Sequence, residues 1–293
     1  MRTFRLERKY ALWGWFFIVP ASLLIVCFSF IPMIQALLLS FQSGIAANLR
    51  FAGFRNYFRL FQDKIFMTSV GNVFTYLIFQ VPIMLVLALI LASILNNKRL
   101  AGKGFFRTLV FLPCATALVS ATIIFKALFA VDGIVNFALT TLKVAPEPVN
   151  FLTDAVLAKF MIILVITWRW TGYNTIFYLA GLQNIDPEIY EAARIDGANV
   201  AHQFFRITLP LLRPVILLTT IMSTNGTLQL FDEPKTMTNG GPGVATQSIS
   251  LYIYKLSFEY NPQFGYAAAV SYTILIMVAL LAMIQLKVGD RAS

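Results

Sequence analysis

Long apolar runs with almost no charged residues recur along this chain and limit what it can fold into. A helix rises about 1.5 Å per residue, so about 20 apolar residues are enough to cross the hydrocarbon core of a bilayer. Counting such runs predicts about six membrane spans. They are residues 12–30, 69–95, 109–130, 155–179, 211–231 and 267–286. The expected fold class is therefore all-α, a polytopic bundle of about six transmembrane helices.

Composition agrees with lipid as the solvent for much of the chain. Hydrophobic residues make up 58% of its 293 residues and charged residues 12%, which is more apolar surface than a soluble domain can bury. Both cysteines, Cys27 and Cys114, lie inside apolar runs and are expected to pack as small apolar side chains. No Cys or His cluster has metal-ligand spacing, so we expect no metal site. Since no segment resembles a soluble second domain, we expect one transmembrane domain over residues 1–293.

The net charge of +10 follows a pattern that predicts membrane topology. Cytoplasmic segments of membrane proteins are enriched in Lys and Arg. The basic clusters are Arg2, Arg5, Arg8 and Lys9 at the start, and Lys98, Arg99, Lys103 and Arg107 in the loop 96–107. Alternation of the spans then predicts that both termini, with Lys287 and Arg291 near the C-terminal end, and the segment 180–210 face the cytoplasm, although the basic segment 42–68 would lie outside. Because the clusters adjoin apolar spans and form no single solvated face, we expect no nucleic-acid binding.

The segment 180–210 carries signals for two short helices joined by a turn. Asp186 can cap a helix whose first residue is Pro187, and Glu188 suits the positive end of its dipole. Gly197 permits the left-handed conformation that ends such a helix. Because residues 198–207 again have helical composition, we expect a helix–turn–helix beneath the membrane.

The spacing inside this segment resembles the EAA signature of ABC importer permeases. The matching residues are Glu191, Ala192, Ala193, Gly197, Ile207, Leu209 and Pro210. In that family the motif forms coupling helices that dock into a groove of the ATPase subunit. The resemblance implies that the ATPase-coupling residues of this chain are Glu191, Ala192, Ala193, Asp196, Gly197, Ile207, Leu209 and Pro210. Without this spacing, the segment would be interpreted as an ordinary surface connector.

Shorter motifs resemble the carbohydrate-uptake branch of the same family. They are Phe51, Gly53, Asn56 and Tyr57 after the first span, residues 179–183 before the coupling segment, and residues 238–242 with Thr246 and residues 252–254. Together they resemble the first of two paired permeases in maltose-type or glycerol-phosphate-type systems. The sequence departs from the maltose-system subunit, which carries extra N-terminal spans and a large periplasmic insertion. The resemblance therefore carries over no particular cargo.

The resemblance also implies a set of partners. They are a second, related permease that forms a heterodimer with this chain, two copies of a cytoplasmic ATPase, and an extracytoplasmic sugar-binding protein. The sequence has no glycine-rich phosphate loop, so ATP and Mg would be held by the ATPase subunits. This chain is expected to be no enzyme and to bind no cofactor. Its expected location is the inner membrane of a bacterium, with a sugar or oligosaccharide as cargo.

Polar residues within the spans are candidates for the transport pathway, because polar groups at membrane depth are costly. In the fifth span Asn225, Gln229 and Phe231 offer the hydrogen bonds and the aromatic face that a sugar needs. In the fourth span Arg169 and Tyr173 are the candidates. Polar contacts between helices, and anchoring of Arg169 at the membrane interface, are the competing interpretations.

Two other functions stay open from the sequence. One is ABC import of a non-sugar solute such as glycerol phosphate or a polyol. The other is an ion-coupled secondary transporter, which predicts repeated halves and carboxylates inside the membrane. Neither feature is clear here, and no acidic residue lies securely inside a predicted span.

Overall fold

The computed structural model describes residues 2–45, 48–97 and 99–290, and for residues 2–12 and Asp290 it describes the backbone alone. Lys98 and Arg291 of the predicted basic segments lie outside the described residues, as do the side chains of the N-terminal cluster. The chain divides into two compact units. They are Met1–Gln62 with Ile253–Thr273, and Asp63–Tyr252 with Ile274–Ser293. The expectation of one transmembrane domain stays a prediction.

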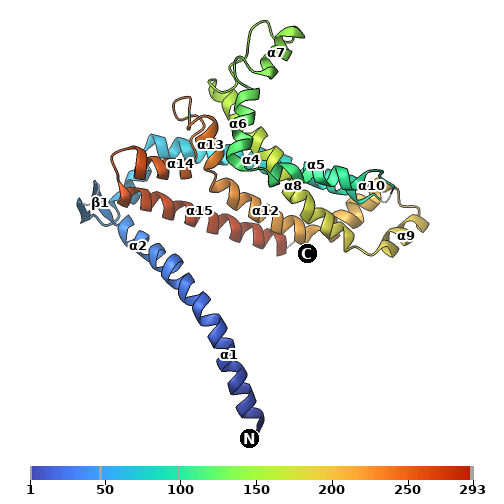
Figure 1. The fold of residues 1–293 in the computed structure, drawn as a ribbon, viewed down its shortest axis with the longest axis horizontal. Coiled ribbons are helices and arrows are strands. Elements are labelled where there is room, and N and C mark those ends of the chain that lie inside the picture. The colour runs from blue at the N-terminus through green and yellow to red at the C-terminus, as the bar shows by residue number, and fades with distance from the viewer. Residues whose placement is uncertain (1, 46–47, 98, 291–293) are drawn as a thin grey trace. The chain divides into compact units, whose positions relative to one another are not determined.

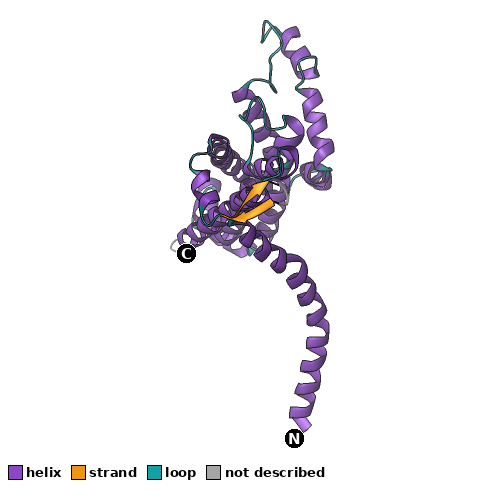
Figure 2. Cartoon of the chain, turned by 90° about the vertical axis from the view of Figure 1, so that its left-hand side faces the viewer, coloured by secondary structure: helices purple, strands orange, loops and turns teal. Residues whose placement is uncertain are grey.

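Helices dominate both units, and strands form a single hairpin in the described part of the chain (Figure 2). The smaller unit begins with three helical elements that run on without interruption (Figure 1). They are α1 (Arg2–Ile25), the π-helical turn η1 (Val26–Phe30) and α2 (Ile31–Ser40). The antiparallel strands β1 (Gln42–Ile45) and β2 (Asn48–Phe51) and the helix α3 (Arg55–Leu60) follow. The all-α fold class is confirmed, with this hairpin as a small addition.

The motif after the first span stabilises the end of α2. Asn56 Nδ2 donates to the backbone oxygens of Ser40 and Gln42, at 2.8 and 2.7 Å. The hydroxyl of Tyr57 lies 2.7 Å from the hydroxyl of Ser40. Gly53 adopts a left-handed φ of 54° in the turn that leads into α3. The motif therefore satisfies polar groups at the end of α2, where a helix leaves carbonyl groups without partners.

The larger unit contains most of the remaining helices (Figure 1). In order they are α4 (Lys64–Asn96), α5 (Lys103–Ala115), α6 (Leu118–Leu128), α7 (Ile134–Thr141), α8 (Ala155–Gln183), α9 (Pro187–Ile195), α10 (Val200–Gln203), η2 (Phe204–Thr208), α11 (Leu209–Leu211), α12 (Arg213–Leu228) and α13 (Asp232–Met237). The chain ends with α14 (Ile249–Tyr254), η3 (Lys255–Glu259) and α15 (Phe264–Asp290). α4 and α8 begin at Asp63 and Asp154, whose carboxylates accept hydrogen bonds from backbone N–H groups of the first turn.

The core of the larger unit lies between α4 and α8, with α5 and α12 packed against them. One hydrophobic cluster consists of Tyr76, Met161, Ile162, Val165, Ile166, Leu230 and Met237. A second consists of Ala88, Ala92, Tyr178, Leu182 and Leu212. α8 passes so close to α5 that a Cβ at Gly172 would lie 2.0 Å from the carbonyl oxygen of Val110. Only glycine fits at this crossing.

The membrane spans differ in two places from the sequence prediction. Four continuous helical stretches are long and apolar enough to cross a membrane, namely Trp13–Ser40, Lys64–Asn96, Ala155–Gln183 and Phe264–Gly289. Two further pairs of helices are long and apolar enough only when each pair is taken as one span, and both pairs are bent. The first pair, Lys103–Ala115 and Leu118–Leu128, meets at 97°. The second pair, Val200–Leu211 and Arg213–Met237, meets at 66°. Counting each bent pair as one span gives six, in agreement with the prediction.

The predicted third span, residues 109–130, is divided between α5 and α6, which meet at 97°. Pro113 lies near the end of α5, and Thr116 and Ala117 have extended backbone with ψ of 138° and 130°. Pro113 removes a hydrogen bond to the turn before it, whereas the break lies after it, at Thr116 and Ala117. The predicted fifth span, 211–231, also ends early, since α12 ends at Leu228.

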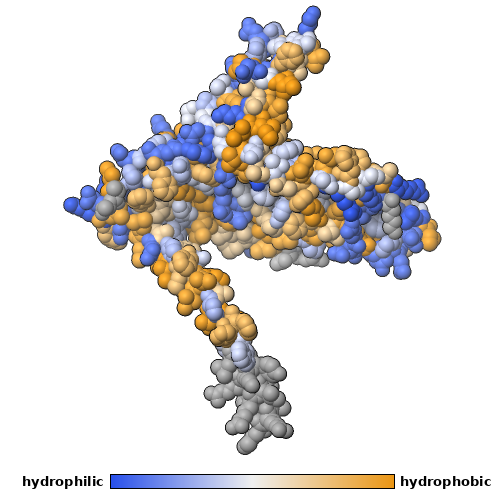
Figure 3. Space-filling model, viewed as in Figure 1, coloured by the Kyte–Doolittle hydropathy of each residue, from blue (hydrophilic) through white to orange (hydrophobic). Residues whose placement is uncertain are grey.

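The surface of the larger unit separates into apolar and polar regions. Exposed apolar side chains follow α4, among them Ile78, Ile83 and Ile90. Hydrophilic side chains gather at the end that carries α9 and α10 (Figure 3). The apolar sides suit lipid or another membrane subunit, and the polar end suits water or a soluble partner.

Candidate functional site

α9 and α10 form the helix–turn–helix that the sequence predicted. The Asp186 side chain accepts a hydrogen bond from the backbone N–H of Glu188 at 3.0 Å, and Pro187 is the first helical residue. α9 ends before Gly197, whose φ is 80°. Asn199 then caps α10 by accepting from the backbone N–H of His202 at 2.8 Å. Each local signal in the sequence therefore has its expected structural role.

Hollows lie on both sides of this helix–turn–helix. A cavity of about 560 Å³ lies between α9, α10 and the ends of α4 and α8. Its wall includes Asn96, Gln183, Tyr190, Glu191 and Arg194. A second cavity, of about 380 Å³, is lined by Ala193, Asp196, Gly197, Ala198, Asn199, His202, Arg206 and Ile207. Of the predicted coupling residues, Glu191 lines the first hollow and Ala193, Asp196, Gly197 and Ile207 line the second. Ala192 lines neither hollow, and Leu209 and Pro210 belong to α11.

An exposed apolar stripe runs along α9. None of the described residues of α9 is buried. Ile189, Ala192 and Ile195 recur every three residues and are all exposed, Ile195 to 88%. Val200 in α10 and Phe205 in η2 are also exposed, to 83% and 64%. The sequence analysis singled out Glu191, Ala192 and Ala193, but it missed this stripe, which the three-residue spacing of Ile189, Ala192 and Ile195 could have revealed.

A hydrogen bond ties α9 to the next element. The hydroxyls of Tyr190 and Thr208 lie 2.9 Å apart. Thr208 is buried at the end of η2, directly before α11 and α12. The contact therefore links α9 with the segment that leads into α12.

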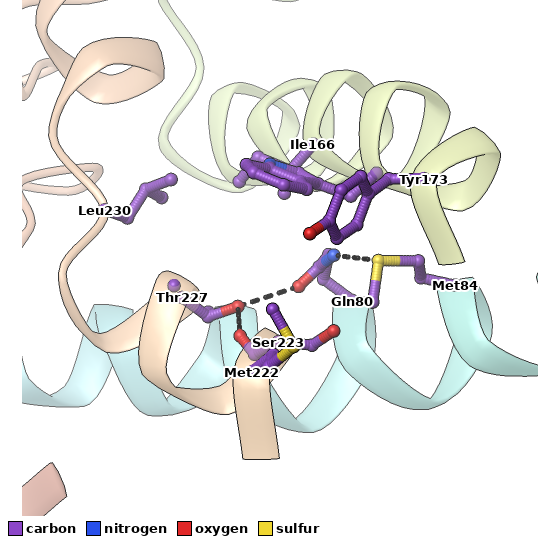
Figure 4. Close-up of a pocket in the computed structure, with 10 residues that line it drawn as sticks. Gln80, Met84, Ile166, Tyr173, Met222, Ser223, Thr227 and Leu230 are labelled. Atoms are coloured by element: carbon purple, nitrogen blue, oxygen red, sulfur yellow. Dashed lines mark hydrogen bonds between the residues drawn. The ribbon is translucent and has the colours of Figure 1, made fainter. Parts of the chain in front are cut away.

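The far end of α12 lines a separate cavity of about 190 Å³ (Figure 4). Its wall comes from α4 with Gln80 and Met84, from α8 with Ile166, Trp170 and Tyr173, from α12 with Met222, Ser223, Gly226 and Thr227, and from Leu230 beyond it. Aromatic rings from α8 lie on one side, and the polar side chains of α4 and α12 lie on the other (Figure 4). The cavity can therefore offer both ring faces and hydrogen bonds to a ligand.

A short hydrogen-bond chain fixes the polar wall. The Thr227 hydroxyl donates to Gln80 Oε1 at 3.0 Å, and Gln80 Nε2 donates to the sulfur of Met84 at 3.1 Å (Figure 4). Gln80 is 1% exposed. Because sulfur is a weak acceptor and an amide NH₂ has two donors, Gln80 retains donor capacity for a ligand in the cavity. Gln80 was not among the residues predicted from the sequence, although an amide in an apolar span is a recognisable signal.

The predicted pathway residues do not gather at one place. Tyr173 lines the cavity. Asn225 and Gln229 are exposed and hydrogen-bond to each other on another face of α12. Phe231 lies in the break between α12 and α13. Arg169 faces Glu233 of α13, with 3.8 Å between Nη1 and Oε1.

Helical periodicity explains this separation. Ser223, Gly226 and Thr227 share a face of α12, whereas Asn225 and Gln229 are two residues out of step with them. A helical projection of the sequence could have divided these polar residues into two sets. It could not have shown which set faces α4 and α8. Among the described residues, no group of three or more His, Cys, Asp or Glu side chains could hold a metal ion.

The chain matches a known protein family over most of its length. The family model described as "Binding-protein-dependent transport system inner membrane component" matches residues 73–288. The lactose transport system permease protein LacF of Rhizobium radiobacter is 50% identical over 282 residues, which cover 96% of this chain and 95% of that protein. The arabinooligosaccharides transport system permease protein AraP of Halalkalibacterium halodurans is 33% identical, over 94% of this chain and 88% of that protein.

A more distant relative and a solved structure agree with this result. The trehalose/maltose transport system permease protein MalF of Thermococcus litoralis is 33% identical, over 98% of this chain and 97% of that protein. A crystal structure of a bacterial ABC transporter involved in the import of alginate contains a chain with a TM-score of 0.82 and 23% identity, with 99% of both chains covered. At that identity the likeness shows a shared fold. The chain therefore belongs to the family of inner membrane components of binding-protein-dependent transport systems.

Proposed function

We propose that this chain is a permease subunit of an ABC importer that moves a sugar or oligosaccharide across the bacterial inner membrane. The observation that carries the proposal is the cavity between α4, α8 and α12. Trp170 and Tyr173 offer ring faces to the C–H surfaces of a sugar, and Gln80, Ser223 and Thr227 offer groups that bond its hydroxyls. Relatives named for lactose, arabinooligosaccharides and trehalose/maltose support the same class of cargo.

A second permease completes the pathway in this proposal. The cavity of about 190 Å³ is smaller than the roughly 300–1,000 Å³ that ligand pockets usually provide. This chain alone therefore encloses part of a sugar's surface. Asn225 and Gln229 stay predicted pathway residues, since their exposed face of α12 is open to the related permease. Phe231, in the break beyond α12, stays a predicted contact for the aromatic face of the sugar.

The energy comes from ATP hydrolysis in two cytoplasmic ATPase subunits, which hold the ATP and Mg. This chain performs no hydrolysis and docks to the ATPase through α9 and α10. The apolar stripe of Ile189, Ala192 and Ile195 fits the groove of such a partner, because exposed apolar patches mark protein interfaces. Glu191, Ala193, Asp196 and Gly197 shape the turn and its charges beside the stripe. An extracytoplasmic sugar-binding protein delivers the cargo.

A displacement of α9 is transmitted to the cavity wall through α12. The Tyr190–Thr208 hydrogen bond and the residues Ile207, Leu209 and Pro210 join α9 and α10 to the start of α12. α12 carries Ser223 and Thr227 at its other end. A shift imposed by the ATPase on α9 therefore changes the cavity wall, provided that ATP and sugar favour different states of the complex.

Both termini and the segment 180–210 face the cytoplasm in this proposal. The test is labelling of Lys103→Cys and His202→Cys with a membrane-impermeant thiol reagent, in a background with Cys27→Ala and Cys114→Ser. We expect labelling from the cytoplasmic side alone. Labelling of His202→Cys from the outer side alone would overturn the topology.

The function is tested with the complete complex in vesicles. The chain is reconstituted with a related permease, an ATPase and a sugar-binding protein from the same organism, and uptake of labelled saccharides and polyols is measured. We expect ATP-dependent uptake of a saccharide that the binding protein binds. Uptake of glycerol phosphate or a polyol alone, or uptake driven by an ion gradient without ATP, would contradict the proposal.

A further inference from the structure

Arg169 of α8 and Glu233 of α13 form an ion pair inside the larger unit. Arg169 Nη1 lies 3.8 Å from Glu233 Oε1, and the two side chains are 16% and 3% exposed. Neither atom makes a hydrogen bond. The Arg169 guanidinium also lies 5.6 Å from the centroid of the Trp170 ring. Two opposite charges are thus held in the interior next to a residue of the cavity wall.

The geometry of this pair does not suit a purely structural contact. The free-energy cost of removing two charges from water is offset only when the two charges are close and further hydrogen bonds satisfy their remaining polar atoms. Here the two atoms lie 3.8 Å apart and neither Nη1 nor Oε1 has a hydrogen-bond partner, so the attraction offsets only part of the desolvation cost. Apolar side chains of similar volume would stabilise a static contact at least as well. Charged residues at membrane depth mark functional positions.

The pair joins the two segments that form one end of the cavity. On α8, Ile166 and Trp170 line the cavity on either side of Arg169 in sequence. On the other segment, Leu230 lines the cavity three residues before Glu233. Leu230 lies just beyond the end of α12, facing the α8 side of the cavity (Figure 4). Contact between Arg169 and Glu233 therefore keeps Leu230 against α8.

α13 lies between a break in the helix and an anchored loop. The break is formed by Gln229 and the following residues, which separate α12 from α13. The loop is held by α4, because Asn72 Nδ2 donates to the carbonyl oxygen of Val244 at 3.0 Å and the Tyr76 hydroxyl donates to that of Thr246 at 3.0 Å. A short helix between such points can tilt about them while its neighbours stay in place.

We propose that the Arg169–Glu233 pair is a latch that closes the α13 end of the cavity. The pair is intact while Leu230 covers the cavity, and it separates when α13 tilts and the cavity opens at this end. Both residues act by positioning α13, without touching the sugar. The inference rests on the proposed function, because it assigns the latch to one step of sugar transport.

Single charge removals in the reconstituted complex test the latch. Glu233→Gln and Arg169→Gln each remove one charge with little change in volume. We expect ATP hydrolysis without sugar-binding protein to rise at least about fivefold, the lower end of typical coupling between linked sites. The exchanged pair, Arg169→Glu with Glu233→Arg, should bring hydrolysis back toward the wild-type value. Lys159→Gln, a charge removal in α8 outside the pair, serves as the control and should leave hydrolysis unchanged.

Two results would overturn the latch. One is wild-type hydrolysis and uptake in both single variants, and the other is an exchanged pair that behaves like the single variants. The proposed function fails separately, since it is contradicted when the wild-type complex moves no sugar.

A cross-link test does not depend on the charge variants. Arg169→Cys and Glu233→Cys are introduced together in a background with Cys27→Ala and Cys114→Ser, and they are bridged by a short, reducible bifunctional thiol reagent. We expect the bridged complex to lose stimulation of ATP hydrolysis by loaded binding protein and to regain it after reduction. Undiminished stimulation in the bridged complex would show a static contact and would reject the latch.

Discussion

The two ends of α12 are built in opposite ways. At its start, α9 has no buried residue among those described and stands between hollows of about 560 and 380 Å³. At its other end, Gln80, Ser223 and Thr227 form a buried polar wall joined by hydrogen bonds. The first region matches a family motif, whereas the second has no motif that sequence reasoning found. In the proposed function, the contacts that constrain α9 belong to the ATPase, while those that constrain the cavity wall lie within this chain.

This contrast leads to a general expectation for variants. A change in α9 should affect assembly with the ATPase and leave the bundle folded, because the side chains there are exposed in this chain. A change at the cavity should affect transport and also the packing of α4, α8 and α12.

The largest effect is expected for Ile195→Asp. Ile195 is 88% exposed, so the bundle should fold as before. A charge within an apolar interface should cost about 2–4 kcal/mol of binding, which corresponds to roughly 30- to 1,000-fold in affinity for the ATPase. Copurification of the ATPase measures this loss. Glu188→Gln, an exposed change near the start of α9, is the matched control, and equal copurification of both variants would reject the apolar stripe as the docking face.

Gly197→Val should weaken the same interface by changing the direction of α10. The φ of Gly197 is 80°, a conformation that a β-branched residue adopts at a cost of about 1–3 kcal/mol. A Cβ at this position meets no atom within 4 Å, so strain alone is tested. We expect reduced ATPase copurification and reduced hydrolysis stimulated by loaded binding protein. Gly197→Asn should be milder, because Asn tolerates left-handed backbone, and an Asn variant as impaired as Val would contradict the role of φ.

Gln80→Leu should impair transport with the ATPase still bound. Loss of the hydrogen bonds that Gln80 makes should cost about 1–3 kcal/mol, or roughly five- to 150-fold in apparent affinity for the sugar. The concentration dependence of sugar uptake by the reconstituted complex measures this apparent affinity. Gln229→Leu removes the same amide from the exposed face of α12, and we expect a smaller loss there. The opposite order would place the sugar path on the face of Asn225 and Gln229.

The smallest effect is expected for Tyr190→Phe, which removes one hydroxyl. A single neutral hydrogen bond contributes about 0.5–1.5 kcal/mol, so sugar moved per ATP should fall roughly two- to tenfold while ATPase copurification stays normal. Thr208→Val removes the same contact and also a 3.3 Å hydrogen bond to the carbonyl oxygen of Gln203, so the double variant should be no worse than Thr208→Val alone. Thr220→Val is the control, since Thr220 bonds within its own helix. Additive losses in the double variant would argue that Tyr190 and Thr208 act separately.

Local chemistry in the sequence determined much of the fold. Apolar runs of sufficient length predicted the spans that became α4, α8 and α15, because burial of a helix in lipid depends on length and composition. Asp186, Pro187 and Gly197 fixed the start and end of α9 through interactions with their own neighbours. The spacing of Glu191, Ala192 and Ala193 relative to Gly197 pointed to the family that the comparisons established.

Tertiary structure alone decided which polar residues meet. Gln80 and Thr227 are 147 residues apart and bond to each other only because α4 and α12 pack together. Arg169 and Glu233 belong to different helices, and the break after Leu228 that brings Glu233 to α8 could not be placed from hydropathy. A polar side chain in an apolar span needs a hydrogen-bonding or ionic partner, but packing between distant helices selects that partner. The sequence thus determined most of the elements and the ends of α9, and the packing of α4, α8 and α12 decided the cavity.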